Sequence, residues 1–540
     1  MKTLGLHLVE ALASHGVQHV FGIPGVHNLE LYRGLAKGPI RHVTGRHEQG
    51  VGFMADGYAR VSGRPGVCFT ITGPGVTNIA TAMGQAYGDS VPLLVISSQN
   101  RRGEAGSGRG FLHELPDQRA LAGNVAAKTF AVARAEELPA AIDAAFELFS
   151  SARPRPVYIE VPLDILASDA SGLSNRRNAA IPAAEPEASA IAAAAAQLRK
   201  AANVVMLAGG GAIRAAPELR RLAERLDAPV VMTVNARGVL PEGHPLAVPM
   251  SPSLGAIREL IMAADVVLAV GTEMGPTDYD MYGVREFSTP RQLIRIDIDT
   301  GQLMRGAQPQ LAVCADAGAT LRALLSSDLG PAHPHGGAAR AASACAASLA
   351  EIARDYPAMA QHLGLLRVIA QAVPKAILVG DSTQTVYAGN LGFNVAAPGS
   401  WFNSATGFGT LGYAVPASAG ASLAAPDRPV VCLVGDGGLQ FTMGELALLR
   451  DVSAWAAIII WNNRGYGEIR TSMLAAGIDP EGVDVQPPDF ACLAQAFGYA
   501  YRKIGSQDAL AQALSQFGAR RQIVVIEIPA NNYFEGHPGE

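Results

Sequence analysis

The chain has 540 residues, 49% of them hydrophobic and 16% charged, which is enough apolar material for several buried cores. Its formal net charge of −5, without a long run of like charges, argues against nucleic acid or an anionic membrane as a main partner. No stretch of about 18 apolar residues occurs, so no membrane span is expected. Five scattered cysteines without a CxxC pattern predict neither a disulfide framework nor a zinc site, and they fit a reducing cytoplasm.

The first part of the chain alternates short apolar strands with helical patterns, which predicts a parallel sheet. The stretch 4–16 has apolar residues at helical spacing and is expected to be a folded helix rather than a signal peptide. A second helix is expected to begin at Thr77-Asn78 and to end at Asp89. Strands are expected at 40–44, 66–72 and 93–97.

Two stretches without apolar periodicity, 168–187 and 328–347, are predicted to be linkers. They would separate three domains with boundaries at 1–167, 188–327 and 349–540. In the second domain the strand VVMLAGGG ends in a glycine run that lacks the spacing of a dinucleotide loop, so we interpret it as a strand-to-helix turn. The expected fold class is α/β, with three doubly wound parallel-sheet domains.

The third domain contains two apolar runs that end in polar residues. The run 429–434 leads into the Gly-Asp-Gly around Asp436, and the run 456–461 leads into Asn463. If these are neighbouring parallel strands, both side chains lie at the carboxyl edge of the sheet, where open α/β folds bind ligands. Carboxylate, amide and carbonyl oxygens suit Mg²⁺, whose remaining positions would accept a diphosphate.

By itself a Gly-Asp-Gly is most often a turn. Here it is followed by 24 residues and then Asn-Asn, and this spacing resembles the thiamine diphosphate signature of the pyruvate decarboxylase and acetolactate synthase superfamily. The stretches RHEQGVGFMADGYAR, TGPGVTN and DSVPLLVIS resemble that family's pyrimidine-binding domain, and NARGVLPEGHP and ADVVLAVG resemble its central domain. GFGTLGYAVPAS resembles its diphosphate-binding domain, so the resemblance covers nearly the whole chain.

The resemblance implies thiamine diphosphate and Mg²⁺ as cofactors. Glu48 matches the activator glutamate, whose carboxyl group hydrogen-bonds N1′ of the aminopyrimidine and favours the imino tautomer that takes the C2 proton. The alternative for Glu48 is a surface ion pair. The metal would be held by the side chains of Asp436 and Asn463 and by the backbone carbonyl of Gly465.

The resemblance also assigns a set of residues to the cofactor. Leu411 matches the bulky apolar residue under the bent cofactor, although plain core packing is the alternative reading. The expected cofactor-binding residues besides Glu48 lie in loops at strand ends and helix starts: Pro24, Gly73, Asn78, Asp381, Ser382, Gln384, Gly409, Leu411, Gly435, Gly437, Gly438 and Tyr466.

In this family the pyrimidine domain of one subunit faces the diphosphate domain of another. Glu48 and Asp436 would then meet only across a subunit interface, so a homodimer or homotetramer is expected. An intact set of Glu48, Asp436 and Asn463 argues against a non-catalytic regulator built on the same fold.

The reaction expected from the cofactor begins with addition to the carbonyl of a 2-oxo acid and loss of carbon dioxide. Protonation of the resulting enamine gives an aldehyde, whereas attack on a second oxo acid gives an acetohydroxy acid. We expect a 2-oxo acid decarboxylase, with acetolactate synthase as the alternative. Val26 and His27 stand where many synthases carry glycines, and Gly271 to Pro276 replaces a flavin-associated motif, so FAD is not expected.

Several residues are candidates for contacts with the substrate. His27 or His113 could donate a proton to the enamine, and a structural role is the alternative for each. Glu468 follows the metal loop and could pair with a guanidinium, or could simply favour the first turn of a helix. The stretches RHEQGVGFMADGYAR, HELPDQ and GYGEIR, the last of which contains Glu468, also resemble bacterial 5-guanidino-2-oxopentanoate (2-ketoarginine) decarboxylases. The full set of expected substrate residues is Val26, His27, His113, Glu114, Glu468 and Ile469.

Overall fold

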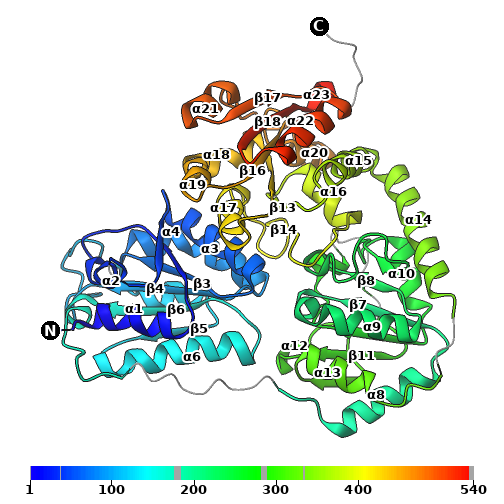
Figure 1. Ribbon diagram of the computed structural model, residues 1–540, viewed down its shortest axis with the longest axis horizontal. Helices are drawn as coiled ribbons and strands as arrows, with labels where there is room; N and C mark the ends of the chain where they lie inside the picture. Colours follow the sequence, from blue (N-terminus) through cyan, green and yellow to red (C-terminus); the bar gives the residue numbers. More distant parts are fainter. Residues whose placement is uncertain are drawn as a thin grey trace.

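The computed structural model describes residues 2–36, 38–174, 184–280, 287, 289–331 and 335–533, and three six-stranded sheets form its frame (Figure 1). Every pairing between their strands is parallel. Helices lie between consecutive strands, as parallel connections require. The predicted fold class, three doubly wound α/β domains, is therefore confirmed.

The first sheet has the strand order β2-β1-β3-β4-β6-β5. Its strands are β1 (His19–Gly22), β2 (Arg41–Thr44), β3 (Gly66–Thr70), β4 (Leu93–Gln99), β5 (Lys128–Ala131) and β6 (Val157–Pro162). Its helices are α1 (Leu4–Ser14), α2 (Leu29–Leu35), α3 (Glu48–Ser62), α4 (Pro74–Gly88), α5 (Gln118–Gly123), α6 (Leu138–Ser151) and α7 (Leu163–Leu166). Helix α4 begins at Pro74, earlier than predicted, because proline fits the first helical turn, where no backbone N–H donor is needed.

The second sheet has the order β12-β11-β10-β7-β8-β9. Its strands are β7 (Val204–Ala208), β8 (Val230–Met232), β9 (Ala247–Val248), β10 (Val266–Val270), β11 (Leu293–Asp297) and β12 (Leu311–Cys314). The glycine run after β7 continues into a 3₁₀ turn, η2 (Gly210–Ala215), in keeping with the turn interpretation. The surrounding helices are α8 (Ala188–Lys200), α9 (Ala216–Leu226), α10 (Gly255–Met262), α11 (Pro276–Tyr279), α12 (Thr300–Leu303) and α13 (Ala317–Leu325).

The third sheet has the order β14-β13-β15-β16-β18-β17. Its strands are β13 (Ile377–Gly380), β14 (Trp401–Asn403), β15 (Val430–Gly435), β16 (Ala456–Asn462), β17 (Ala500–Lys503) and β18 (Ile523–Pro529). Its helices are α15 (Pro357–Ala372), α16 (Gln384–Gly392), α17 (Ala414–Ala424), α18 (Asp436–Phe441), α19 (Leu446–Asp451), α20 (Gly467–Ala475), α21 (Phe490–Phe497), α22 (Gln507–Ala519) and α23 (Ala530–Tyr533).

The second predicted linker, 328–347, is helical from residue 337 on, which the sequence analysis did not predict. Helix α14 (Gly337–Asp355) begins there and extends from the central domain to α15 along one edge of the molecule (Figure 1). Alanine-rich sequence resembles a linker in composition but has the highest helix propensity, and here Ala341 and Ala344 are buried. Part of the first predicted linker, 175–183, lies outside the described residues.

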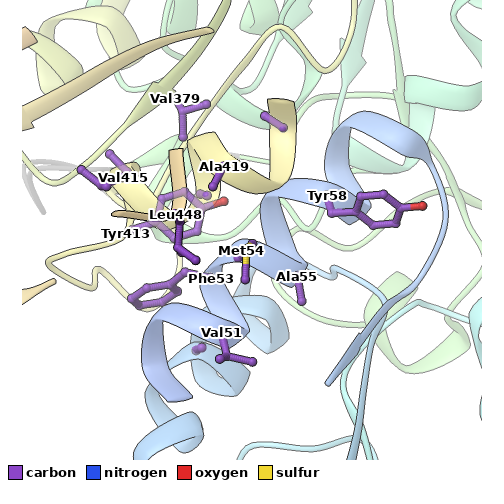
Figure 2. Close-up of a cluster of buried hydrophobic side chains, with 14 of the residues drawn as sticks. Val51, Phe53, Met54, Ala55, Tyr58, Val379, Tyr413, Val415, Ala419 and Leu448 are labelled. Atoms are coloured by element: carbon purple, nitrogen blue, oxygen red, sulfur yellow. The ribbon is translucent and has the colours of Figure 1, made fainter. Parts of the chain in front are cut away.

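The first and third domains share one hydrophobic core, in which α3 packs closely against α17 (Figure 2). The labelled side chains come from both helices, from β13 and α19, and from Tyr413, which directly precedes α17. Two glycines permit the close approach: a Cβ at Gly57 would lie 2.2 Å from the carbonyl oxygen of Ala417, and one at Gly420 would lie 1.9 Å from that of Met54. The two domains are thus fixed against each other by backbone contact.

Among the described residues, no helix has both the length and the apolar character needed to cross a bilayer.

Candidate cofactor and metal site

The two predicted polar strand ends lie side by side in the third sheet. Strands β15 and β16 are adjacent and parallel, with Gly435 paired to Trp461. Asp436 and Asn463 therefore follow at the same carboxyl edge, and the backbone N–H of Asn463 donates to Oδ1 of Asp436 at 3.3 Å. The geometry that the sequence spacing predicted for these two residues is present in the fold.

The side-chain amide of Asn463 faces two oxygen atoms at this edge, and with its own oxygen inward the three form an oxygen cluster. In that orientation the amide oxygen lies 2.7 Å from the carbonyl oxygen of Gly465 and 3.1 Å from Oδ1 of Asp436. Neighbouring ligands in an octahedron with metal–oxygen bonds of about 2.1 Å are separated by about 3 Å. The opposite orientation of the amide would donate to both oxygens, so a bound cation would select the orientation with oxygen inward.

Asp436 has the character of an open metal ligand. It is 1% exposed, and its Oδ2 atom has no hydrogen-bond partner among the described residues. Burial raises the pKa of its carboxyl group, and backbone hydrogen bonds from Asn463 and its neighbours oppose that rise. A divalent cation would compensate the buried charge. One carboxylate with neutral amide and carbonyl oxygens is a donor set that suits Mg²⁺ shared with phosphates. Among the described residues, no group of three His, Cys, Asp or Glu could hold a metal.

The residues expected around the diphosphate border this oxygen cluster. A Cβ at Gly437 would lie 2.8 Å from the ring of Tyr466, so only glycine lets the two segments approach this closely. Gln384 accepts a hydrogen bond from the indole of Trp461 at 3.0 Å.

Asp381 is fully buried, and burial raises its pKa to about 6. Its carboxylate accepts the N–H groups of Ser382 at 2.8 Å and Ala414 at 3.3 Å. Asp381 therefore holds the loop start and the first turn of α17 together.

Leu411 lies in the loop before α17. It is half-buried and belongs to none of the hydrophobic clusters in the described part of the chain, which weakens the core-packing alternative. Its carbonyl oxygen accepts a long hydrogen bond of 3.4 Å from the side chain of Gln49, the neighbour of Glu48.

Glu48 is the first residue of α3 and is 9% exposed. Asn78, from α4, donates from Nδ2 to Oε2 of Glu48 at 3.0 Å, so two predicted cofactor residues are in direct contact. The guanidinium of Arg46 pairs with Asp451 at 2.6 Å, and no ion pair of Glu48 occurs among the described residues. The surface ion-pair alternative is therefore not supported.

Glu445 was not found by sequence analysis. Its carboxylate, almost completely buried, accepts the backbone N–H groups of Arg46 at 3.0 Å and His47 at 2.8 Å, immediately before Glu48. Burial raises its pKa, which these hydrogen bonds oppose. The third domain thus holds the backbone that presents Glu48. A contact between residues 398 positions apart leaves no local signal in a single sequence.

His27 and His113 come together although they are distant in the sequence. Their rings lie 5.0 Å apart and edge to face, in loops of the first domain. Burial and the neighbouring His113 lower the pKa of His27, so His27 is neutral near pH 7. Val26, beside it, is 67% exposed.

Glu114 has a role within its own loop. Its two carboxylate oxygens accept hydrogen bonds from Ser107 Oγ and from the backbone N–H groups of Gly108, Gly110 and Phe111, at 2.7 to 3.0 Å. A carboxylate has about four acceptor positions, and all are used here. The predicted contact between Glu114 and substrate therefore gains no support.

Glu468 and Ile469 are exposed on α20, a helix without buried residues. Burial raises the pKa of Tyr387 to about 12, and the charge of Glu468 adds to this rise, so the carboxylate lies within electrostatic reach of Tyr387. These two residues belong to the third domain, whereas the histidine pair belongs to the first.

The arrangement of sheets, the oxygen cluster and the Glu48–Asn78 contact agree with what comparison with known families finds. Three family models match the chain: the N-terminal TPP binding domain of thiamine pyrophosphate enzymes at residues 2–121, their central domain at 191–324, and their C-terminal TPP binding domain at 380–528. The chain belongs to the thiamine pyrophosphate enzyme family. The predicted family and the predicted cofactor thiamine diphosphate are confirmed.

Individual relatives are similar over nearly the full length. The chain is 45% identical to the probable 2-ketoarginine decarboxylase AruI of Pseudomonas aeruginosa, over 97% of this chain and 94% of the relative. It is 32% identical to the acetolactate synthase isozyme 1 large subunit of Escherichia coli, over 85% and 81%. It is 30% identical to an acetolactate synthase of Arthrospira platensis, over 95% and 92%.

Proposed function

We propose that this thiamine diphosphate enzyme decarboxylates 5-guanidino-2-oxopentanoate, a 2-oxo acid with a cationic tail, and releases the corresponding aldehyde. The observation that carries the proposal is the exposed carboxylate of Glu468, two residues beyond Tyr466 and three beyond the carbonyl of Gly465. A guanidinium binds a carboxylate in a bidentate manner, which would orient the tail of the substrate. The similarity to a probable 2-ketoarginine decarboxylase supports the same substrate.

Mg²⁺ would be held by Asp436, Asn463 and the carbonyl of Gly465, with its other positions open to a diphosphate. Bound thiamine diphosphate supplies the electron sink that makes loss of carbon dioxide possible. Glu48 would hold a proton at N1′ of the pyrimidine, and Asn78 fixes the position of the Glu48 carboxylate.

His27 and His113 would hold and deliver a proton beside the reacting carbon of the substrate. Their rings are in edge-to-face contact at 5.0 Å, and an imidazole is the side chain suited to such proton transfer. Protonation there ends the reaction at an aldehyde and prevents attack on a second oxo acid, which favours the decarboxylase over the synthase.

The test is product analysis on purified protein with thiamine diphosphate and Mg²⁺, with 5-guanidino-2-oxopentanoate and pyruvate offered separately. Aldehyde from the guanidino acid, with little turnover of pyruvate, supports the proposal. Acetolactate from pyruvate would instead support the second candidate, an acetolactate synthase, which the relatives at 32% and 30% identity favour.

We also propose that the active enzyme is a homodimer or homotetramer with its sites between protomers. Apolar side chains are exposed near the histidine pair and near the metal edge. Burying these two groups of side chains against each other between protomers would stabilise the assembly. These side chains are Val26, Leu29 and Leu112 in the first domain and Phe441, Ile469 and Leu474 in the third.

Complementation between inactive variants tests the shared site. If Glu48 and Asp436 act across an interface, subunits carrying Glu48→Gln mixed with subunits carrying Asp436→Asn form heterodimers with one intact site, and about a quarter of full activity returns. If both residues act within one chain, mixing restores nothing.

A further inference from the structure

The loop between β14 and α17, residues 404–413, contains the predicted cofactor residues Gly409 and Leu411. It has no regular secondary structure, and three of its glycines have positive φ angles. One side borders a cavity of about 270 Å³, lined in part by Gly407 and Phe408, and Phe408 is 56% exposed. On this side the ring of Phe408 lies against Gly84 of α4, where a Cβ would come within 2.7 Å of it, and polar contacts hold the next part of the loop.

Gln85, on α4 of the first domain, joins both ends of this loop. Its Oε1 accepts hydrogen bonds from the backbone N–H of Thr410 at 3.2 Å and from the hydroxyl of Thr410 at 2.9 Å. Its Nε2 donates to the carbonyl oxygen of Thr406 at 3.2 Å and to Asp89 at 2.8 Å. A side-chain amide has two donors and two acceptor positions, and all four are used.

Asp89, the residue that follows α4, also contacts this loop. It accepts a hydrogen bond from the hydroxyl of Thr406 at 3.0 Å and is itself paired with Arg60 at 2.6 Å. Arg60 also contacts Asn235 of the central domain at 3.2 Å. All three domains thus meet at the loop, and the contacts are buried, where an unpaired polar group is costly.

We propose that Gln85 is a positioning residue for the cofactor: its amide fixes the loop 404–413 so that Leu411 is presented beneath thiamine diphosphate. The proposal rests on the position inferred above for Leu411 and on the cofactor of the family. Gln85 would touch neither cofactor nor substrate, and it acts through Thr406 and Thr410, directly and through Asp89. Its effect should therefore appear in cofactor affinity before it appears in the chemistry.

The chemistry of the amide explains why no similar side chain replaces it. Methionine has the same length but offers no hydrogen bond, so it would leave the Thr410 N–H and the Thr406 carbonyl unpaired. Glutamate could accept from Thr410, but it would place a second carboxylate against Asp89 and would donate nothing to Thr406.

A double-mutant cycle tests the proposal. Gln85→Met, Thr410→Val and the double variant are compared for the dissociation constant of thiamine diphosphate with saturating Mg²⁺, by calorimetry and without any substrate. We expect about a tenfold weaker dissociation constant for Gln85→Met and at most that for Thr410→Val, whose backbone N–H still donates to Gln85. The double variant should match Gln85→Met, because that change already removes the hydroxyl contact. Gln516→Met, at an exposed position of α22, is the matched control and should bind the cofactor normally.

Two results would overturn the proposal. An unchanged dissociation constant in Gln85→Met, together with a lower melting temperature, would reduce Gln85 to a stabilising residue. A double variant weakened by the product of the two single effects, up to about a hundredfold, would mean that Gln85 and Thr410 act independently. Because no substrate enters the measurement, a wrong substrate assignment leaves it unaffected. Thr410→Val keeps the test available if Gln85→Met does not fold.

Discussion

Asp436 at the carboxyl edge of the third sheet and Asp89 at the junction of the three domains are both almost completely buried, but their hydrogen bonds differ. Asp89 accepts from Arg60, Gln85, Thr406 and Asn235, so both of its oxygens are satisfied. Asp436 keeps one oxygen without a partner in the described part of the chain, and the side chain of Asn463 lies beside the other. A native fold tolerates such an uncompensated charge where a ligand completes it, so the contrast separates a binding site from a structural junction.

Removing the charge from each aspartate in turn is the strongest test of this difference between a binding site and a structural junction. Asp436→Asn should raise the Mg²⁺ concentration needed for half-maximal activity by about a thousandfold, because the only carboxylate of the cluster is lost. Its apoprotein should melt at the same or a higher temperature, since an unpaired buried charge disappears. Titration of activity with Mg²⁺ and calorimetry of the apoprotein measure the two effects.

For Asp89→Asn we expect the opposite effect on stability. The change removes one of the two carboxylates that pair with Arg60, which keeps its ion pair with Asp56 at 2.6 Å. We expect a loss of about 1–3 kcal/mol in the free energy of unfolding, the range for a buried hydrogen bond to a charged group. If Asp89→Asn is stable while Asp436→Asn unfolds, then Asp436 is the structural residue and the interpretation of the two aspartates is wrong.

Glu48→Gln tests the part of the cofactor site that the first domain contributes. The amide keeps the shape and can still contact Asn78, but it cannot hold the proton at N1′. We expect turnover to fall by about a hundred- to a thousandfold while thiamine diphosphate binds with nearly unchanged affinity. Single-turnover rates and calorimetric binding separate the two quantities, and near-normal turnover would exclude the activator role.

Glu468→Leu should have a smaller effect that depends on the substrate. Loss of a charge-assisted contact at an exposed position should raise KM for the guanidino acid about tenfold and leave KM for pyruvate unchanged. Glu481→Leu, an exposed acidic residue further along the chain, serves as the control. Equal changes in KM for both substrates would contradict a contact between Glu468 and the substrate, and would leave only its role in the first turn of the helix.

The smallest expected effect is on the pH dependence of stability. Burial raises the pKa values of Asp278 and Asp381 to about 6, above the value near 4 of an unfolded aspartate. Between these values the folded protein binds protons that the unfolded chain does not, so the apoprotein should gain about 1 kcal/mol per group as pH falls from 7 to 5. Urea unfolding against pH measures this, and Asp278→Asn should flatten the profile.

The sequence predicts the metal edge because its chemistry is local. Asp436 and Asn463 each end an apolar run, and parallel strands align their ends, so spacing alone brings the two residues together. Glu48 and Asn78 are found differently, through short motifs that resemble those of the family.

The residues that the sequence does not reveal act between domains. Glu445 holds the backbone before Glu48 from the third domain, and Gln85 holds a third-domain loop from the first. Neither lies in a motif of its own, because what it contacts is set by how the sheets pack. Helix α14 was missed for a different reason: its alanine content was interpreted as low complexity rather than as helix propensity.

The glycine contacts between α3 and α17 limit how members of such a fold can be recombined. Gly57 and Gly420 hold two backbones so close that any side chain with a Cβ would collide. A third domain produced alone would expose the face of α17 that now covers α3. A third domain taken from a relative would need a surface that fits the same face of α3 equally closely. Exchanging specificity between relatives therefore calls for transplanting surface loops onto an intact chain, whereas cutting at the domain boundaries would yield fragments that aggregate.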